Sequence, residues 1–198
     1  MKTMKYIYAI MLALLLTACS ASGDKQTEEK SDEVDHSAHM AEGKEQPKSK
    51  SPASQAMSII GENHVHIEYH SPSKRDRQIF GGLVAYGEVW VTGAHNATSI
   101  RFSKDVEIGG IEIPEGKYAL FTIPREDEWT VIINKNWDQH LVDEYNEAED
   151  IVRLKVTPEK LEEPVESLTY EVIAEDAKTG TIVISWDDVS VSFTVKNA

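Results

Sequence analysis

The sequence predicts an all-β fold, an antiparallel β-sandwich or open barrel with one short helix. Apolar and polar residues alternate along several runs, as they do in strands with one buried and one solvent-facing side. Gly109-Gly110, between two apolar triplets, fits a two-residue hairpin whose central residues need positive φ. Short strands at this spacing are typical of sandwiches and barrels. The predicted strands are 64–70, 88–92, 98–106, 111–113, 117–123, 129–134, 152–156, 168–172, 182–186 and 189–195.

Three segments depart from the alternating pattern. Apolar residues recur at helical spacing from Trp137 to Ala148, which predicts a short amphipathic helix over 137–148. Asp187-Asp188 is expected to turn the last two strands back on each other, and 73–83 is compatible with either loop or helix.

Residues 1–18 have the features of a signal peptide. Lys2 and Lys5 precede an apolar stretch that is too short to span a bilayer as a mature helix. Residues 16–19, Leu-Thr-Ala-Cys, resemble the lipobox of bacterial lipoproteins. The resemblance implies that Cys19 carries a diacylglycerol, that the chain is cut just before it, and that the protein is anchored to a membrane of the cell envelope. The alternative is an ordinary secretory signal that ends near a cysteine.

Residues 19–57 differ in composition from the rest. Val34 and Met40 are nearly the only large apolar residues before Met57, so this segment buries too little surface to offset the entropy of ordering. We therefore expect a disordered acidic tether over 19–57 and a β-sandwich domain over 58–198.

Composition and motifs exclude several classes of function. The net charge of −14 argues against nucleic-acid binding, which needs a basic surface. The single cysteine can form neither an internal disulfide nor a multi-cysteine metal site. The chain has no nucleophile elbow, phosphate-binding loop, dinucleotide fingerprint or zinc-protease helix motif. We expect a protein that is not an enzyme.

Histidines carry the strongest chemical signal. His64, His66 and His70 share one face of a predicted strand, with neighbouring positions about 6.6–7 Å apart. His95 follows another predicted strand and would add a ligand if the strands are neighbours. Imidazoles on one rigid face suit copper, zinc or nickel. The alternative is a solvent face on which histidine is an ordinary polar residue, and His140 is expected to be a surface or packing residue.

The tether has its own cluster, Asp35-His36-Ser37-Ala38-His39-Met40. It resembles the Asp-His-Ser-x-Met segments of bacterial envelope proteins that handle copper. His36, His39 and Met40 combine imidazole with thioether, which suits copper and favours Cu(I). The alternative is a polar linker with two chance histidines.

Several strings of the domain resemble a bacterial domain-of-unknown-function family, the one catalogued as twenty-nine-eleven. The resemblance implies a secreted or lipid-anchored β protein and brings no activity with it. The family commonly reads Trp-Arg-Thr-Gly-Ala-Asn where this chain has Val91 and His95, so an arginine-based site is in doubt and a metal site gains support. The strings are residues 69–73, 78–90, 92–94, 113–124 and 128–135.

The sequence therefore favours a lipid-anchored binding module of the envelope that takes up a transition metal, with copper first. One alternative is a structural or interaction lipoprotein that binds no metal. Another is a glycan-directed enzyme, which would need convergent carboxylates. Exposed tryptophans could serve a sugar ligand, but core packing is the preferred interpretation for Trp90, Trp129, Trp137 and Trp186.

Overall fold

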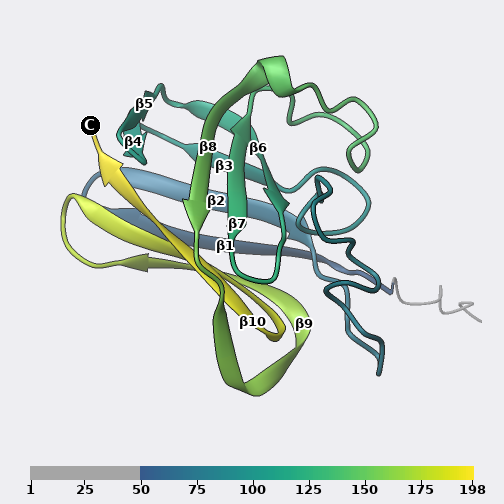
Figure 1. Ribbon diagram of the computed structural model, residues 1–198. Coiled ribbons are helices and arrows are strands. Elements are labelled where there is room, and N and C mark those ends of the chain that lie inside the picture. Colours follow the sequence, from purple (N-terminus) through teal and green to yellow (C-terminus); the bar gives the residue numbers. More distant parts are fainter. Residues whose placement is uncertain (1–49) are drawn as a thin grey trace, which may run out of the picture. The chain divides into compact units, whose positions relative to one another are not determined.

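The computed structural model describes residues 50–198, and two antiparallel sheets within them form a sandwich (Figure 1). The all-β prediction is confirmed. The predictions for Cys19, His36, His39 and Met40 lie outside the described residues. The strands are β1 (Ala53–Ile60), β2 (Asn63–His70), β3 (Ser99–Phe102), β4 (Val106–Ile108), β5 (Ile111–Ile113), β6 (Gly116–Ile123), β7 (Trp129–Asn134), β8 (Asp150–Val156), β9 (Glu159–Ala174) and β10 (Thr179–Asn197).

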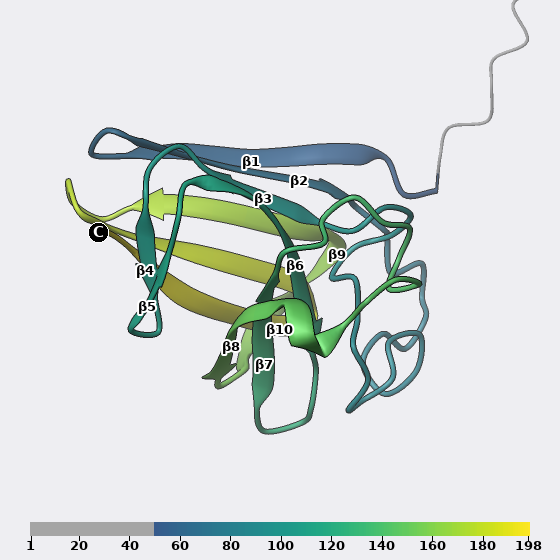
Figure 2. The same cartoon turned by 90° about the horizontal axis from the view of Figure 1, so that it is seen from above.

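The two sheets differ in size and strand order. The first has six strands in the order β1-β2-β3-β6-β7-β8, and the second has four in the order β5-β4-β10-β9. Figure 2 shows the strands of the second sheet lying beneath β1, β2 and β3, with the long loops gathered at one end.

The hairpin predicted at Gly109-Gly110 joins β4 to β5, and both glycines have positive φ, 61° and 83°. No helix in the described part of the chain is long and apolar enough to cross a membrane.

Strand β1 begins inside the segment expected to be a tether. Ala53 is its first residue, so the predicted boundary at residue 58 falls within the strand. It is an edge strand, paired along its length with β2, and it is built mostly from small and polar residues. Backbone hydrogen bonds to β2 hold this strand in the sheet, although its residues do not show a clear hydrophobic pattern in the sequence.

The helix predicted over 137–148 is wrong. The segment is a series of turns that ends in a short 3₁₀ helix, η1 (Glu147–Glu149). Leu141 has a φ of 48°, a left-handed conformation that interrupts any right-handed helix. The amide side chain of Gln139 donates to Asn136 O and accepts from Glu144 N, so it competes with helical backbone bonding.

The turn predicted at Asp187-Asp188 is also wrong. Strand β10 runs through these residues, and its pairing with β9 shifts register on both sides of Asp187. Between Ser185 and Val189 strand β9 has more residues than β10, so the ladder is irregular there, and Asp187 has a φ of 55°. The segment 73–83 consists of turns without a helix, and within 88–92 only Trp90 makes a strand-like bridge, to Thr122.

The main core fills the space between the sheets. It includes Trp129 and Trp186, which are almost fully buried around Phe80, with the half-buried Trp90 beside them. This confirms core packing for three of the four tryptophans. Trp137 is the exception, since 38% of its surface is exposed.

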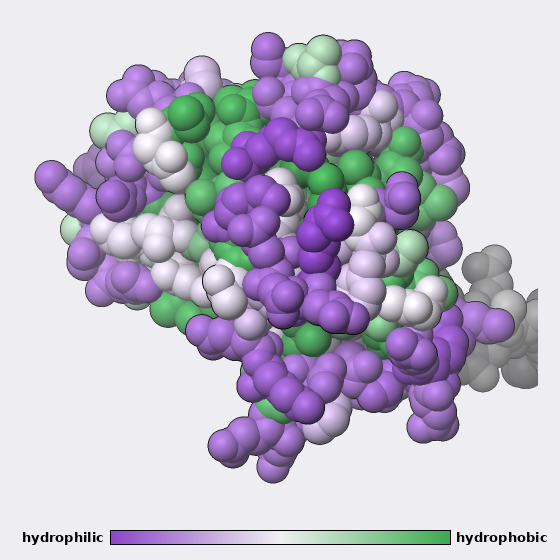
Figure 3. Space-filling view, in the orientation of Figure 1, coloured by the Kyte–Doolittle hydropathy of each residue, from purple (hydrophilic) through white to green (hydrophobic). Residues whose placement is uncertain are grey.

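A second, smaller core lies on the outer face of the six-stranded sheet. Phe121 and Ile132 from β6 and β7 pack there under Val91, Ala97 and Tyr145 from the loops. The loops therefore cover β6 and β7 on this side and leave the β1–β2–β3 side open. In Figure 3 hydrophilic side chains cover most of the face seen in Figure 1, with hydrophobic ones between them.

Candidate functional site

The open part of the outer face carries the predicted histidine row. Along β2, Val65, Ile67 and Tyr69 are buried, whereas the alternate positions are exposed or half-buried. His64, His66 and His70 therefore share the outer face, as the sequence predicts. The strand places Glu68 on that face between His66 and His70.

Two of these histidines have separate surroundings. His64 is exposed, and the backbone N–H of His64 donates to Ser103 Oγ at 2.8 Å. The Nε2 of His66 lies 3.1 Å from Gln55 Oε1 on β1. Neither ring is in contact with another histidine among the residues that the structure describes.

His70 and His95 do meet. Their ring centroids are 4.9 Å apart with an interplanar angle of 77°, so the edge of one ring faces the other. His70 is half-buried and His95 is exposed. Burial lowers the pKa of His70, and the nearby charge of His95 lowers it further, so the His70 imidazole favours the neutral form that metals bind.

The loop that carries His95 is held by buried hydrogen bonds at Thr92. The Thr92 hydroxyl donates to Trp90 O and lies 2.9 Å from Thr122 Oγ1. Its carbonyl oxygen accepts from Thr98 Oγ1 at 3.0 Å and from the Tyr170 hydroxyl at 2.7 Å. These bonds hold Thr92 at a φ of 52°, which is unusual for a β-branched residue.

The same loop approaches β2 closely. A Cβ on Gly93 would lie 2.7 Å from Thr98 Oγ1 and 3.4 Å from His70 O, so only glycine fits without displacing its neighbours. His95 itself has a φ of 62°, and its carbonyl oxygen accepts from Leu141 N at 2.7 Å. The loop is therefore fixed both to the sheet and to the segment around residue 141.

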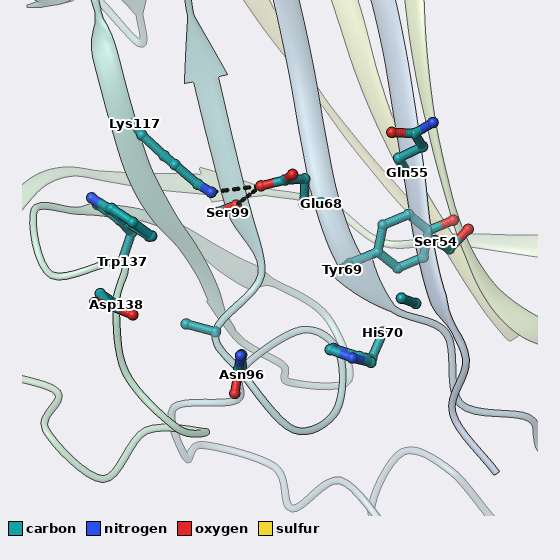
Figure 4. Close-up of a pocket in the computed structure, with 12 residues that line it drawn as sticks. Ser54, Gln55, Glu68, Tyr69, His70, Asn96, Ser99, Lys117, Trp137 and Asp138 are labelled. Carbon is teal, nitrogen blue, oxygen red and sulfur yellow. Dashed lines mark hydrogen bonds and ion pairs between the residues drawn. The ribbon is translucent and has the colours of Figure 1, made fainter. Parts of the chain in front are cut away.

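A groove of about 410 Å³ begins at His70 and runs across the open face (Figure 4). Strands β1, β2, β3 and β6 form its floor, and the loops around Asn96 and Trp137 form its wall. Within it, Lys117 Nζ donates to Glu68 Oε2 at 2.5 Å, and Ser99 Oγ donates to the same oxygen at 3.3 Å.

The Glu68 carboxyl in the groove favours its ionised form. The hydrogen bond from Lys117 is the main cause that lowers the pKa of Glu68. Lys117 Nζ also lies 4.3 Å from the centroid of the Trp137 ring, a cation–π contact. A general acid for glycoside hydrolysis needs a raised pKa, so Glu68 is poorly suited to that role.

The histidines could hold a metal only in part. No group of three or more His, Cys, Asp or Glu side chains within residues 50–198 could hold a metal ion together. His66 does not join His70 and His95, because His66 and His70 are four residues apart on β2, about 13 Å, and His64 lies farther along the same strand. His140 is exposed, and its Nδ1 lies 3.0 Å from Asp143 Oδ2.

The structure adds residues that the sequence reasoning missed. Met57 pairs directly with His66 across β1 and β2, and 59% of its surface is exposed. The sequence prediction places Met57 in the tether, although the apolar residues Met57, Ile59 and Ile60 could have indicated a strand. Lys117 reaches the groove because β6 pairs with β3, and Trp137 reaches it from a loop. The sequence predicts neither the strand pairing nor the path of the loop.

Residues 51–195 match the family described as Protein of unknown function (DUF2911). No curated protein and no solved structure matches the chain.

Proposed function

Since the chain belongs to this family, DUF2911, whose description carries no activity, we propose a function from the site itself. The protein is a non-enzymatic binding module, anchored to a membrane of the bacterial envelope through Cys19. It takes up a transition-metal ion, with copper as the first candidate, and His70 and His95 are the primary ligands.

The contact between the His70 and His95 rings carries this proposal. Imidazole nitrogens bind zinc and copper at about 2.0–2.1 Å, so two rings that share a metal must come from the same small region. The rings meet at the end of the groove, where one is half-buried and the other is open to incoming ions. The lowered pKa of His70 leaves a lone pair available near neutral pH.

Two imidazoles leave further coordination positions on a bound metal ion, and water molecules would fill them.

Met57 offers a thioether beside His66, about 13 Å along the sheet from His70. Its thioether stands on the outer face, directly opposite His66. Soft thioether ligands favour Cu(I) over Cu(II) and zinc, whereas imidazole accepts all three ions. The open face of β1 and β2 therefore holds a thioether in addition to the histidine row.

Titration calorimetry of residues 20–198 tests the proposal, with Cu(II), with Zn(II) and anaerobically with Cu(I). Replacing both His70 and His95 by alanine is expected to weaken binding at least tenfold, whereas His64→Ala is the matched control on the same face. A Met57→Leu variant is expected to leave binding at the His70–His95 pair unchanged, because Met57 pairs with His66, about 13 Å along β2 from His70. Labelled palmitate that enters the wild-type chain but not a Cys19→Ser variant checks the anchor.

Several outcomes would overturn the assignment. Equal affinity in wild type and in the double variant removes the His70–His95 site. Loss of binding only in His66→Ala and Met57→Leu moves the metal to the middle of the strand. Loss only when His36, His39 and Met40 are replaced places it on the segment before residue 50.

The groove also supports a second candidate function, the binding of a small polar organic molecule. Its volume of about 410 Å³ suits a small ligand, and it combines the exposed ring of Trp137 with the Glu68–Lys117 pair. A sugar ring could stack on the tryptophan while its hydroxyls bond to the charged pair. Binding of glycan fragments that is lost in Trp137→Ala, with metal affinity unchanged, would favour this function.

A further inference from the structure

A second cavity, of about 430 Å³, lies on the other side of the 92–95 loop, among the turns that follow β2. Its floor contains Trp90 and Trp186, whose rings stack with centroids 5.8 Å apart at 21°. The indole N–H of Trp186 already donates to Glu166 O at 3.2 Å, so the ring presents carbon surface to the cavity. This interior is apolar and aromatic.

Large apolar side chains continue to the mouth of the cavity. Leu83 and Leu141 line it, yet 51% and 36% of their surfaces are exposed. Covering these exposed leucines with a ligand would remove their apolar surface from water, which favours binding. The mouth therefore favours a ligand whose apolar part extends outward along these residues.

The rim of the same cavity is cationic. Lys50, Arg75 and Arg77 line it, in a chain with 34 acidic and only 20 basic residues. None of the three forms an ion pair with a carboxylate in the part of the chain that the structure describes. The rim therefore gathers three cationic side chains at one place on an acidic protein.

The guanidinium groups are positioned by backbone carbonyl groups. Arg75 Nη2 donates to Lys50 O at 2.8 Å, and Arg77 donates through Nε to Lys74 O and through Nη2 to Ser73 O. Glu166 is the neighbouring carboxylate, and it accepts from the backbone N–H of Arg75. Each guanidinium has five N–H donors, so donors remain for an anionic ligand.

We propose that this cavity binds a single-chain anionic amphiphile of the fatty-acid type. Its carboxylate pairs with the guanidinium groups of Arg75 and Arg77, and its chain lies over Trp90 and between the two leucines. Guanidinium groups suit carboxylates because their donors match both oxygens. The inference does not depend on metal binding, because it uses none of the histidines.

Octanoate is the probe, added to residues 20–198 and followed by tryptophan fluorescence and calorimetry. Trp90 and Trp186 line the cavity, so occupancy is expected to change their emission directly. Acetate supplies the head without the chain, and octanol supplies the chain without the charge. We expect octanoate to bind at least tenfold more tightly than either, and equal affinity for octanol and octanoate would overturn the proposal.

Variants at the mouth test the charge without disturbing the core. Leu83→Glu is expected to weaken octanoate binding at least tenfold, whereas Leu83→Lys, of similar length and opposite charge, keeps or tightens it. The double variant Arg75→Gln, Arg77→Gln is expected to lose at least tenfold. Arg101→Gln is the matched control, since Arg101 is exposed on β3 and outside the cavity.

Further outcomes decide against the proposal. An equal loss in Arg101→Gln would show that net charge alone drives binding. Binding to anionic phospholipid vesicles without any binding of octanoate would assign the surface to a membrane instead. Octanoate binding that disappears in the His70→Ala, His95→Ala variant would place the ligand in the other groove.

Discussion

The outer face of the six-stranded sheet has two halves that differ in what covers them. Over β6 and β7 it presents Ala119, Phe121 and Ile132, and loops bury these residues. Over β2 and β3 the corresponding positions are polar and uncovered, His66, Glu68 and Arg101 among them, and β1 adds the exposed Met57 and Ile59. The groove forms where the cover ends, so the site depends on the boundary between an apolar and a polar half of one face.

Phe121→Ala is expected to have the largest effect, because it removes a fully buried ring from the covered half. The ring packs edge to face against Tyr145 at 5.5 Å between centroids. Truncation of a buried phenylalanine costs about 3–5 kcal/mol. In the open half, His66→Ala is expected to change the free energy of unfolding by no more than about 0.5 kcal/mol.

Urea unfolding of both variants measures this difference. If His66→Ala destabilises the protein as much as Phe121→Ala, the division into a covered and an open half is wrong. Phe121→Leu serves as the control, since it keeps most of the buried volume and should lose much less stability.

Tyr170→Phe tests the attachment of the loop that separates the two halves. The buried Tyr170 hydroxyl donates to Thr92 O at 2.7 Å, and its removal is expected to cost about 0.5–1.5 kcal/mol. The loop that holds His95 then loses one of its supports, so metal affinity is expected to fall with stability.

Tyr118→Phe is the comparison for that variant. Its hydroxyl donates to Pro114 O at 2.8 Å in an exposed position, so its loss should cost less and leave metal affinity unchanged. Equal losses of stability and of affinity in the two variants would mean that the Thr92 loop does not position His95.

The alternating pattern was sufficient to predict the open half along β2 but not its neighbours. Val65, Ile67 and Tyr69 alternate with polar residues, and burial follows that alternation. Strand β1 escaped prediction because an edge strand is held by backbone pairing, which places few demands on its side chains. As a result Met57, which stands opposite His66, was not considered as a ligand.

The covered half was harder to predict because loops form it. The spacing of Trp137, Leu141 and Tyr145 is helical, but a left-handed Leu141 and the bonds of Gln139 produce turns instead. Of the candidate ligands, His70 and His95 come together because the loop from Thr92 returns to the end of β2. That return depends on tertiary hydrogen bonds that sequence alone does not contain.

The smallest expected effect concerns the Glu68–Lys117 pair in the open half. The pKa of Glu68 is lowered in the folded state, mainly by the hydrogen bond from Lys117, so the pair stabilises the fold above the usual pKa of 4.5. That contribution is lost as the pH falls below 4.5 through the lowered pKa, because protonation of Glu68 removes its charge. Lys117→Met is expected to cost about 0.2–1 kcal/mol at pH 7, as for other solvent-exposed pairs, and nearly nothing from this pair in strong acid.

Unfolding free energies of wild type and variant from pH 7 to pH 3 measure the difference. Lys135→Met is the control, because Lys135 has no carboxylate partner among residues 50–198. Its unfolding free energy should differ from that of wild type by the same amount at every pH. A difference that is equally constant for Lys117→Met would show that the pair contributes no stability.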